Sequence, residues 1–291
     1  MTVYCLGSIN SDHFYRLPHL PKPGETLAAA GYQRGLGGKG VNQSIAALRA
    51  GSTVVHIGAI GIDDPWIEGQ ITRHGLTLDT IARVPQGTGH AIVAVDDAGE
   101  NQIIIHSAAN QAQSSALLAQ ILATARPGDI LLLQNETSHQ VEAARQARAL
   151  GLLVFYSAAP FALDPLRAVL PFATHLLLNA GEAQALVAAT GTALADLPVQ
   201  AVIVTKGSQG AEWICAGAEP LFVPAFKVTP VDTTGAGDCF AGSLAAALDQ
   251  GQAPAQAMRY AAAAAALQVT RPGTADAMPS RAQVEAFLAG L

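Results

Sequence analysis

Short apolar runs alternate with segments of mixed polarity along most of the chain. The apolar runs lie at 2–9, 53–60, 129–133, 152–156, 175–178 and 199–204. They contain few polar residues, which is typical of strands that are covered on both faces. The segments that follow several of these runs predict helices at about 35–50, 114–125, 139–150 and 182–190. Strands that alternate with helices favour an α/β fold with one parallel, doubly wound sheet and right-handed crossovers.

One region, 88–109, breaks this alternation. Apolar residues at 91–95 and 102–106 flank D-D-A-G-E at 96–100, which predicts a β-hairpin with a glycine-containing loop. With an extended segment before Gly35, the hairpin predicts a small second sheet that covers the main domain. We therefore expect a main α/β domain of residues 1–10, 36–88 and 110–291, and a small β unit of residues 11–35 and 89–109. An ordinary edge hairpin is the alternative interpretation.

Composition argues against several classes of protein. The chain has 291 residues, of which 50% are hydrophobic, and it is long enough to bury one large core. A net charge of −6 without any run of lysine or arginine argues against nucleic acid or an anionic membrane as a partner. The N-terminus lacks the basic segment of a signal peptide, and the longest apolar run, 261–267, is too short to span a bilayer. Cys5, Cys215 and Cys239 show no ligand or disulfide spacing, so we expect reduced thiols and a cytoplasmic protein.

The strongest chemical signal is V-D-T-T-G-A-G-D-C-F-A-G-S-L-A-A-A-L at 231–248. Phe240, Leu244 and Leu248 recur at helical spacing, so the small residues before them form a loop that enters a helix. Unpaired N–H groups at such a helix start attract an anion, and glycines let the backbone approach it closely. Asp238 stands where that anion would bind, which suits a group that takes a proton from an attacking hydroxyl. An aspartate that merely caps the helix is the alternative interpretation.

Polar residues stand at or just after the ends of several predicted strands. They are Asn10, Gln134, Glu136, Asn179 and Thr205. Ligands of open α/β sheets bind outside the carboxyl ends of the strands, so we expect these side chains to share one cleft. The chain has no G-x-x-x-x-G-K-[ST] motif, and a P-loop enzyme is therefore excluded.

Two motifs, D-T-T-G-A-G-D at 232–238 and G-G-K-G-V-N at 37–42, resemble the two signatures of the ribokinase family of carbohydrate kinases. The similarity runs from Gly7 to about Pro279. It implies a ribokinase-like fold in which the small β-sheet is a lid over the sugar. It also implies an enzyme that uses ATP and Mg²⁺ to phosphorylate a primary hydroxyl of a sugar, with D-ribose, giving ribose 5-phosphate, as the leading substrate. A homodimer through the lid is implied as well, and open strand edges favour such pairing.

The resemblance assigns roles to individual residues. Asp238 is the implied catalytic base, and the anion hole is formed by Gly235, Ala236 and Gly237. The implied sugar-binding set is Asn10, Asp12, Gly38, Lys39, Asn42 and Glu136, together with Asp238. The implied ATP-binding set is Asn179, Thr205, Gly207, Ser208 and Gly210, together with Gly235 and Gly237. A site that bonds each hydroxyl of its ligand strongly rejects analogues that lack one.

Two metal sites are also implied. In N-A-G-E at 179–182, Glu182 matches a residue that organises Mg²⁺ through water, and one carboxylate suffices because Mg²⁺ keeps most of its waters. A helix cap is the alternative interpretation of this element. The implied ligands of a monovalent cation, K⁺ in the family, are Asp232 and the carbonyls of Thr234, Gln268, Arg271 and Gly273. Ala277 departs from the pattern, since the family usually has a hydroxyl there.

Other departures concern the substrate. S-A-A-P at 157–160 replaces N-P-A-P, and Ala262 replaces a polar residue beside the adenine. His90 in the hairpin is larger and more polar than the expected aliphatic residue, and it either touches the sugar or faces solvent. Kinases for another furanose, a ketohexose, a sugar acid or a nucleoside therefore stay open, as does a non-catalytic sugar-binding protein. The intact Asp238 and Glu182 argue against the last, because a binding module needs no base beside an anion hole.

Overall fold

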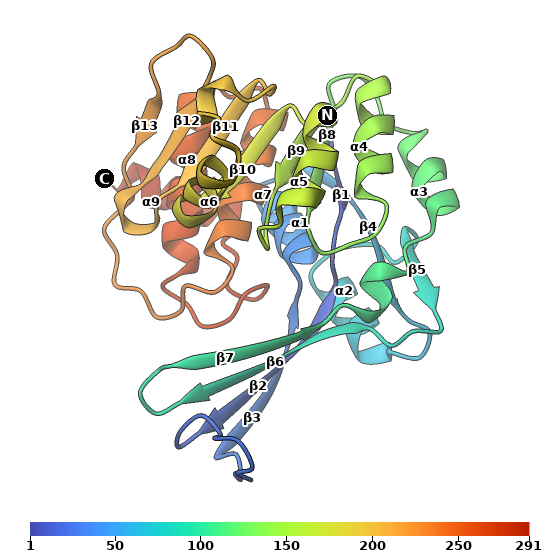
Figure 1. Ribbon diagram of the computed structural model, residues 1–291, viewed down its shortest axis with the longest axis vertical. Helices are drawn as coiled ribbons and strands as arrows, with labels where there is room; N and C mark the ends of the chain where they lie inside the picture. The colour runs from blue at the N-terminus through green and yellow to red at the C-terminus, as the bar shows by residue number, and fades with distance from the viewer. Residues whose placement is uncertain (291) are drawn as a thin grey trace.

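The computed structural model describes residues 1–290 and contains a large and a small β-sheet (Figure 1). The large sheet has nine strands in the order β13-β12-β11-β10-β9-β8-β1-β4-β5. They are β1 (Thr2–Leu6), β4 (Thr53–Gly61), β5 (Ile81–Val84), β8 (Ile130–Gln134), β9 (Leu153–Ser157), β10 (His175–Asn179), β11 (Ala201–Thr205), β12 (Ala211–Ile214) and β13 (Leu221–Val223). Neighbours from β11 to β5 are parallel, whereas β12 is antiparallel to both β11 and β13. The predicted doubly wound parallel sheet is confirmed, with two unforeseen antiparallel strands at one edge.

Helices cover both faces of the large sheet (Figure 1). The first face is covered by α1 (Lys39–Arg49), α2 (Pro65–Arg73), α7 (Ala236–Asp249), α8 (Pro254–Gln268) and α9 (Arg281–Ala289). The second face is covered by α3 (Ser115–Leu122), α4 (Gln140–Ala149), α5 (Leu163–Val169) and α6 (Ala180–Thr190). Four 3₁₀ turns complete the connections: η1 (Ala108–Gln111), η2 (Leu170–Phe172), η3 (Leu194–Asp196) and η4 (Gly207–Gln209). No helix within residues 1–290 is both long and apolar enough to cross a bilayer.

Two separate hydrophobic cores result from the pleat of the strands. Successive side chains of a strand point to opposite faces. In β1, Val3 and Cys5 therefore join the core under α1 and α7, while Tyr4 and Leu6 join the core under α3 and α4. This double burial explains why the strands are apolar without alternation in the sequence.

The small sheet projects from the carboxyl ends of the large one and has the order β3-β2-β6-β7 (Figure 1). Its strands are β2 (Asn10–Leu17), β3 (Gly31–Gly37), β6 (Gly89–Asp96) and β7 (Asn101–His106). The antiparallel pairing of β6 with β7 confirms the predicted hairpin. It is not an isolated edge hairpin, because β6 also pairs in parallel with β2 over eight residues, from Asn10↔Gly89 to Leu17↔Asp96.

One predicted boundary is wrong. The glycine-rich segment was expected to open a helix from Gly35, but Gly35 and Gly37 belong to β3 and α1 begins at Lys39. The backbone of Gly37 pairs with Asn10 on β2, so a strand partner from outside the segment decides its conformation. Gly38 then turns the chain with φ 102°, a conformation that a residue with a Cβ rarely adopts.

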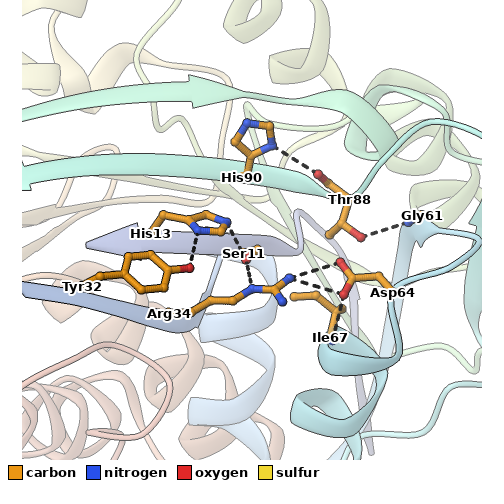
Figure 2. Close-up of polar contacts among 9 residues, drawn as sticks. All are labelled: Ser11, His13, Tyr32, Arg34, Gly61, Asp64, Ile67, Thr88 and His90. Carbon is orange, nitrogen blue, oxygen red and sulfur yellow. Dashed lines mark hydrogen bonds and ion pairs between the residues drawn. The ribbon is translucent and has the colours of Figure 1, made fainter. Parts of the chain in front are cut away.

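Arg34 joins the small sheet to the main body (Figure 2). From β3, its Nε donates to the Ser11 hydroxyl at 2.6 Å, and its Nη2 pairs with Asp64 at 3.3 Å. Asp64 caps α2 by accepting from the N–H of Ile67 at 3.3 Å. The guanidinium also lies 3.9 Å from the ring centre of Trp66. The base of the small sheet is thus attached to the first turn of α2.

Candidate active site

A cavity of about 220 Å³ lies where the parallel strands end. Strand ends and helix starts meet there: Ser157, Asn179 and Thr205 from β9, β10 and β11, Lys39 from α1, Glu182 from α6, and 235–238 from the start of α7. The first N–H groups of a helix have no partner within the helix, and three helix N-termini border this cavity. Their dipoles make the cavity a favourable place for an anion.

Helix α1 directs a polar face into the site. Lys39, Asn42 and Gln43 are three and four positions apart and therefore share one side of the helix. Gly38, just before it, is packed against the segment that joins β1 to β2: a Cβ there would lie 2.7 Å from the carbonyl oxygen of Ser8. A glycine is therefore required at this position, and it sets the direction in which α1 leaves the sheet.

Asp238 lies in the first turn of α7, which begins after Gly235 in a left-handed conformation, φ 79°. One carboxylate oxygen accepts from Nδ2 of Asn42 and the other from Nε2 of Gln43, both at 3.1 Å. Burial raises the pKa of Asp238 to about 6, although the charge of Lys39 and these two amides lower it. An acid with such a pKa is ionised at neutral pH and can still accept a proton, as a general base must.

One residue behind Asp238, Gln43, was missed by the sequence interpretation. Gln43 is fully buried, and its Oε1 accepts from Nε2 of Gln134 at 2.8 Å while its own Nε2 bonds Asp238. Gln134 was expected in the cleft only as a strand-end residue. The available signal for Gln43 was its position, four residues after Lys39 on the same helical face.

Asp12 approaches the site from β2 on the small sheet. Its carboxylate lies against Gly37, where any Cβ would overlap it, and its Oδ1 is buried without a hydrogen-bond partner in residues 1–290. Burial raises the pKa of Asp12 to about 7, and the nearby charge of Glu136 adds to this effect. A buried acceptor without a donor is costly, so a donor from outside the chain is expected here.

Among the remaining residues of the implied sugar set, Lys39 and Glu136 contact each other, whereas Asn10 bonds to Asn110. Lys39 Nζ lies 3.6 Å from Oε1 of Glu136, and the backbone N–H of Lys39 donates to Oε2 at 3.2 Å. Burial lowers the pKa of Lys39, but the charges of Asp238, Glu136 and Glu182 outweigh this effect and raise it overall. The Oδ1 of Asn10 accepts from Asn110 at 2.8 Å. The structure thus brings Asp12, Lys39, Asn42, Glu136 and Asp238 together.

Only part of the implied nucleotide-binding set lines the cavity. Asn179 and Thr205 are register partners at the ends of β10 and β11, and both line the cavity with Gly235 and Gly237. Gly207, Ser208 and Gly210 form the turn after β11 and lie outside the cavity lining. Lys206 points away from the cavity, because its Nζ pairs with Glu212 at 2.5 Å.

Glu182 caps α6, as one of its two interpretations predicted, and its carboxylate also lies in the cavity. Its Oε2 accepts from the N–H of Asn179 at 2.8 Å, and Asn179 Oδ1 accepts from the N–H of Glu182 at 2.9 Å, which is a capping box. The same carboxylate lines the cavity, where burial raises its pKa. A single carboxylate at the edge of an anion-binding cavity fits Mg²⁺, because this ion is usually bound by one or two carboxylates together with water and phosphate oxygens.

The implied monovalent-cation residues are also neighbours, but they do not fit a cation. Asp232 accepts from the N–H groups of Thr234 and Gly273 at 2.9 and 3.0 Å. The side-chain Nε2 of Gln268 donates to the carbonyls of the same two residues at 2.8 and 3.1 Å. Arg271 donates its backbone N–H to Gln268 O at 3.1 Å and its Nη1 to Gln283 at 3.3 Å. A hydrogen-bond donor therefore stands between two carbonyls that would ligate the ion.

His90 does not face Asp12. It pairs with Ser11 across β2 and β6, so it lies on the face of Ser11 and His13, opposite to that of Asp12. Its ring is 6.2 Å from that of His13, and its Nδ1 lies 3.5 Å from the carbonyl of Thr88 (Figure 2). A sugar bound beside Asp12 would therefore lie on the opposite face of the small sheet from His90.

Comparison with known proteins agrees with this geometry. The family model for pfkB family carbohydrate kinases matches residues 2–281. The ribokinase of Haemophilus influenzae is 34% identical over 99% of this chain and 98% of its own length, and the deoxyribokinase of Salmonella typhimurium is 31% identical over 99% of each. The structure of Arabidopsis thaliana ribokinase complexed with ribose and ATP is similar with a TM-score of 0.85, at 30% identity over 99% of this chain and 98% of that one.

This chain belongs to the pfkB family of carbohydrate kinases. It is a phosphotransferase that acts on an alcohol group, as the two sequence motifs predict.

Proposed function

We propose that this chain transfers the γ-phosphoryl group of ATP to O5 of D-ribose, in the presence of Mg²⁺. One observation carries the proposal: an ionisable Asp238 is held by Asn42 and Gln43 at the start of α7, in an anion-binding cavity. The relative from Arabidopsis thaliana, complexed with ribose and ATP, supports this choice of substrates. K⁺ is not part of the proposal, because the Gln268 amide lies between the carbonyls of its expected site.

In this mechanism Asp238 takes the proton of the primary hydroxyl as the hydroxyl oxygen bonds to the γ-phosphorus and ADP leaves. The N–H groups of Gly235 and Gly237 donate to the oxygens of the transferred group, whereas the N–H of Ala236 donates to Thr233 O at 3.2 Å and is not used. The ammonium of Lys39 offsets negative charge. Glu182 would hold Mg²⁺ through water, and the ion would supply neutralisation of the phosphate charge. Such transfers need alignment and electrostatic stabilisation more than covalent chemistry. We assign the nucleotide phosphates to the side of Asn179 and Thr205, and Gly207, Ser208 and Gly210 to the rim beyond it.

The small sheet is proposed as the lid over the sugar, with boundaries at 11–35 and 89–109. The unsatisfied, buried Oδ1 of Asp12 favours a ligand that offers hydroxyl donors at this position. Ribose has one more hydroxyl than deoxyribose, so an acceptor that needs a donor favours ribose. The relatives named deoxyribokinase make deoxyribose the second candidate.

Catalysis is tested by replacing Asp238→Asn, which keeps the side-chain shape and removes the base. We expect kcat to fall about 10²- to 10⁴-fold in a coupled ADP-release assay, with ribose affinity by calorimetry nearly unchanged. Asp164→Asn is the matched control, since Asp164 is an exposed acid in the first turn of α5. Near-normal turnover by Asp238→Asn would remove the proposed base. The same assay over pentoses, deoxyribose, hexoses, sugar acids and nucleosides tests the substrate.

We also propose a homodimer that forms through the small sheet. All six residues of β7 are exposed, and Ile103, Ile104 and Ile105 keep 53%, 66% and 54% of their surface in solvent. A long apolar edge strand in solvent invites pairing with a second copy. Ile104→Lys should convert a dimer to a monomer in analytical ultracentrifugation, whereas Val141→Lys, on exposed α4, should not. A monomeric unmodified chain at micromolar concentration would contradict this assembly.

A further inference from the structure

Gln268 ends α8 with its residue fully buried between two loops of the site. Its Nε2 donates to Thr234 O, in the loop that leads to Gly235, and to Gly273 O, in the loop after α8. Both bonds are of normal length, 2.8 and 3.1 Å. One side-chain amide therefore joins the anion-binding loop to the segment behind it.

The direction of the amide follows from its surroundings. An amide presents two N–H donors on one side and an acceptor on the other. If the amide were reversed, Oε1 would face two carbonyl oxygens, and like partial charges would repel. In the observed orientation Oε1 is instead buried without a partner in residues 1–290. The two donated bonds outweigh this single unsatisfied acceptor.

Two more of the expected ligands, Asp232 and the Gln268 carbonyl, are also engaged. Both oxygens of Asp232 accept backbone N–H groups, and the backbone carbonyl of Gln268 accepts from Arg271. Ala277, fully buried, offers a methyl group instead of an oxygen. A K⁺ ion needs several carbonyl or hydroxyl oxygens in place of its hydration shell, and here a nitrogen stands among them.

We propose that the side-chain amide of Gln268 replaces the monovalent cation, so that the loop before Gly235 is held in place without K⁺. The amide hydrogens supply the partial positive charge that two neighbouring carbonyls need. The other loop that Gln268 bonds, the one after α8, is also connected to the small sheet, because Thr274 Oγ1 in that loop donates to Leu36 O at 3.1 Å. The kinetic consequences rest on the kinase function proposed above, whereas the ion-binding consequences do not.

The test compares the unmodified chain with Gln268→Ala in KCl and in tetramethylammonium chloride at equal ionic strength. Gln250→Ala is the matched control, because Gln250 Nε2 also donates to a backbone carbonyl, that of Ala50 at 3.0 Å, away from the cavity. The thermal midpoint and the titration of Tl⁺, a spectroscopic substitute for K⁺, are measured without substrates. Turnover with ribose and ATP is measured in the same salts.

The unmodified chain and Gln250→Ala should show the same midpoint and turnover in both salts and no saturable Tl⁺ binding. Gln268→Ala should lose about three- to tenfold in kcat/KM without K⁺ and regain it in KCl. Its midpoint should rise by about 2–4 °C on binding K⁺. Saturable Tl⁺ binding or K⁺ activation of the unmodified chain would overturn the proposal. A Gln268→Ala chain that matches the unmodified one in every salt would also overturn it. If the chain has no kinase activity at all, the midpoint and Tl⁺ results still decide the ion question.

Discussion

Asp238 on the main domain and Asp12 on the small sheet both have pKa values raised by burial, but their surroundings differ. Both oxygens of Asp238 receive hydrogen bonds from side chains of α1. Asp12 has an oxygen without any partner in residues 1–290 and rests against Gly37. The position of Asp238 is therefore fixed before any ligand binds, whereas Asp12 needs a hydrogen-bond donor from a ligand. In the proposed kinase, the reacting group would thus lie on the preorganised part of the molecule and a recognition group on the small sheet.

Asp12→Asn is the substitution that distinguishes the proposed roles of the two carboxylates most clearly. We expect KM for ribose to rise about 10- to 100-fold, because a charged acceptor is replaced by a neutral one that also offers donors. The value of kcat should change only a few-fold, in contrast to Asp238→Asn. Steady-state kinetics and calorimetry with ribose measure both effects. The distinction fails if Asp12→Asn lowers kcat as strongly as Asp238→Asn and leaves KM intact.

The pH dependence of kcat/KM sharpens the same contrast. Asp238 and Asp12 have pKa values of about 6 and about 7, so both lose their charge as pH falls. Activity should therefore be maximal above the higher value and should fall as pH drops through 7 and then 6. In Asp12→Asn the step near 7 should disappear, and the step near 6 should remain. Loss of the lower step instead would mean that Asp12, not Asp238, accepts the proton.

These pKa shifts also affect stability, and the sign is opposite to that of activity. A carboxyl whose pKa is raised on folding binds its proton more tightly in the folded chain than in the unfolded one. The folded state is therefore favoured at low pH, and stability falls as pH rises from about 4 through about 7. The thermal midpoint of Asp12→Asn is compared with that of the unmodified chain at pH 8 and at pH 5. The gain from the substitution should be larger at pH 8, where the aspartate is charged. A buried carboxylate such as Asp12 that lowers the stability of the folded chain is expected where function requires its charge.

The sequence was informative where local rules decide the structure. The apolar runs predicted the parallel strands, and the small residues before Phe240 predicted a helix start with Asp238 in its first turn. The hairpin of β6 and β7 followed from its glycine-containing loop. In each case the sequence pattern that supports the prediction lies within a few residues along the chain.

Features that depend on distant partners were not predictable in this way. Strand β2 is polar and does not alternate, and it is a strand because β3 and β6 pair with it. Gln43 lies one residue beyond the matched motif, and only the folded helix shows that it reaches Asp238. The side chain of Gln268 likewise meets Thr234 from 34 residues away. Sequence patterns name the residues of a site more readily than they show what each side chain bonds.

The smallest expected effect concerns the junction between the two regions. Arg34 on β3 and Arg83 on β5 each pair with an acid of the α2 segment, Asp64 at 3.3 Å and Glu68 at 2.6 Å. Partly exposed pairs of this kind contribute about 0–1 kcal/mol, so Arg34→Met and Arg83→Met should lower the thermal midpoint by similar small amounts. Of the two arginines, only Arg34 lies on the sheet that carries Asp12, so only Arg34→Met should raise KM for ribose, by about two- to fivefold, with kcat unchanged. Equal KM values for the two variants would mean that Arg34 stabilises the fold without positioning the small sheet. A fall in kcat would instead place the junction in the catalytic step, which the fixed surroundings of Asp238 argue against.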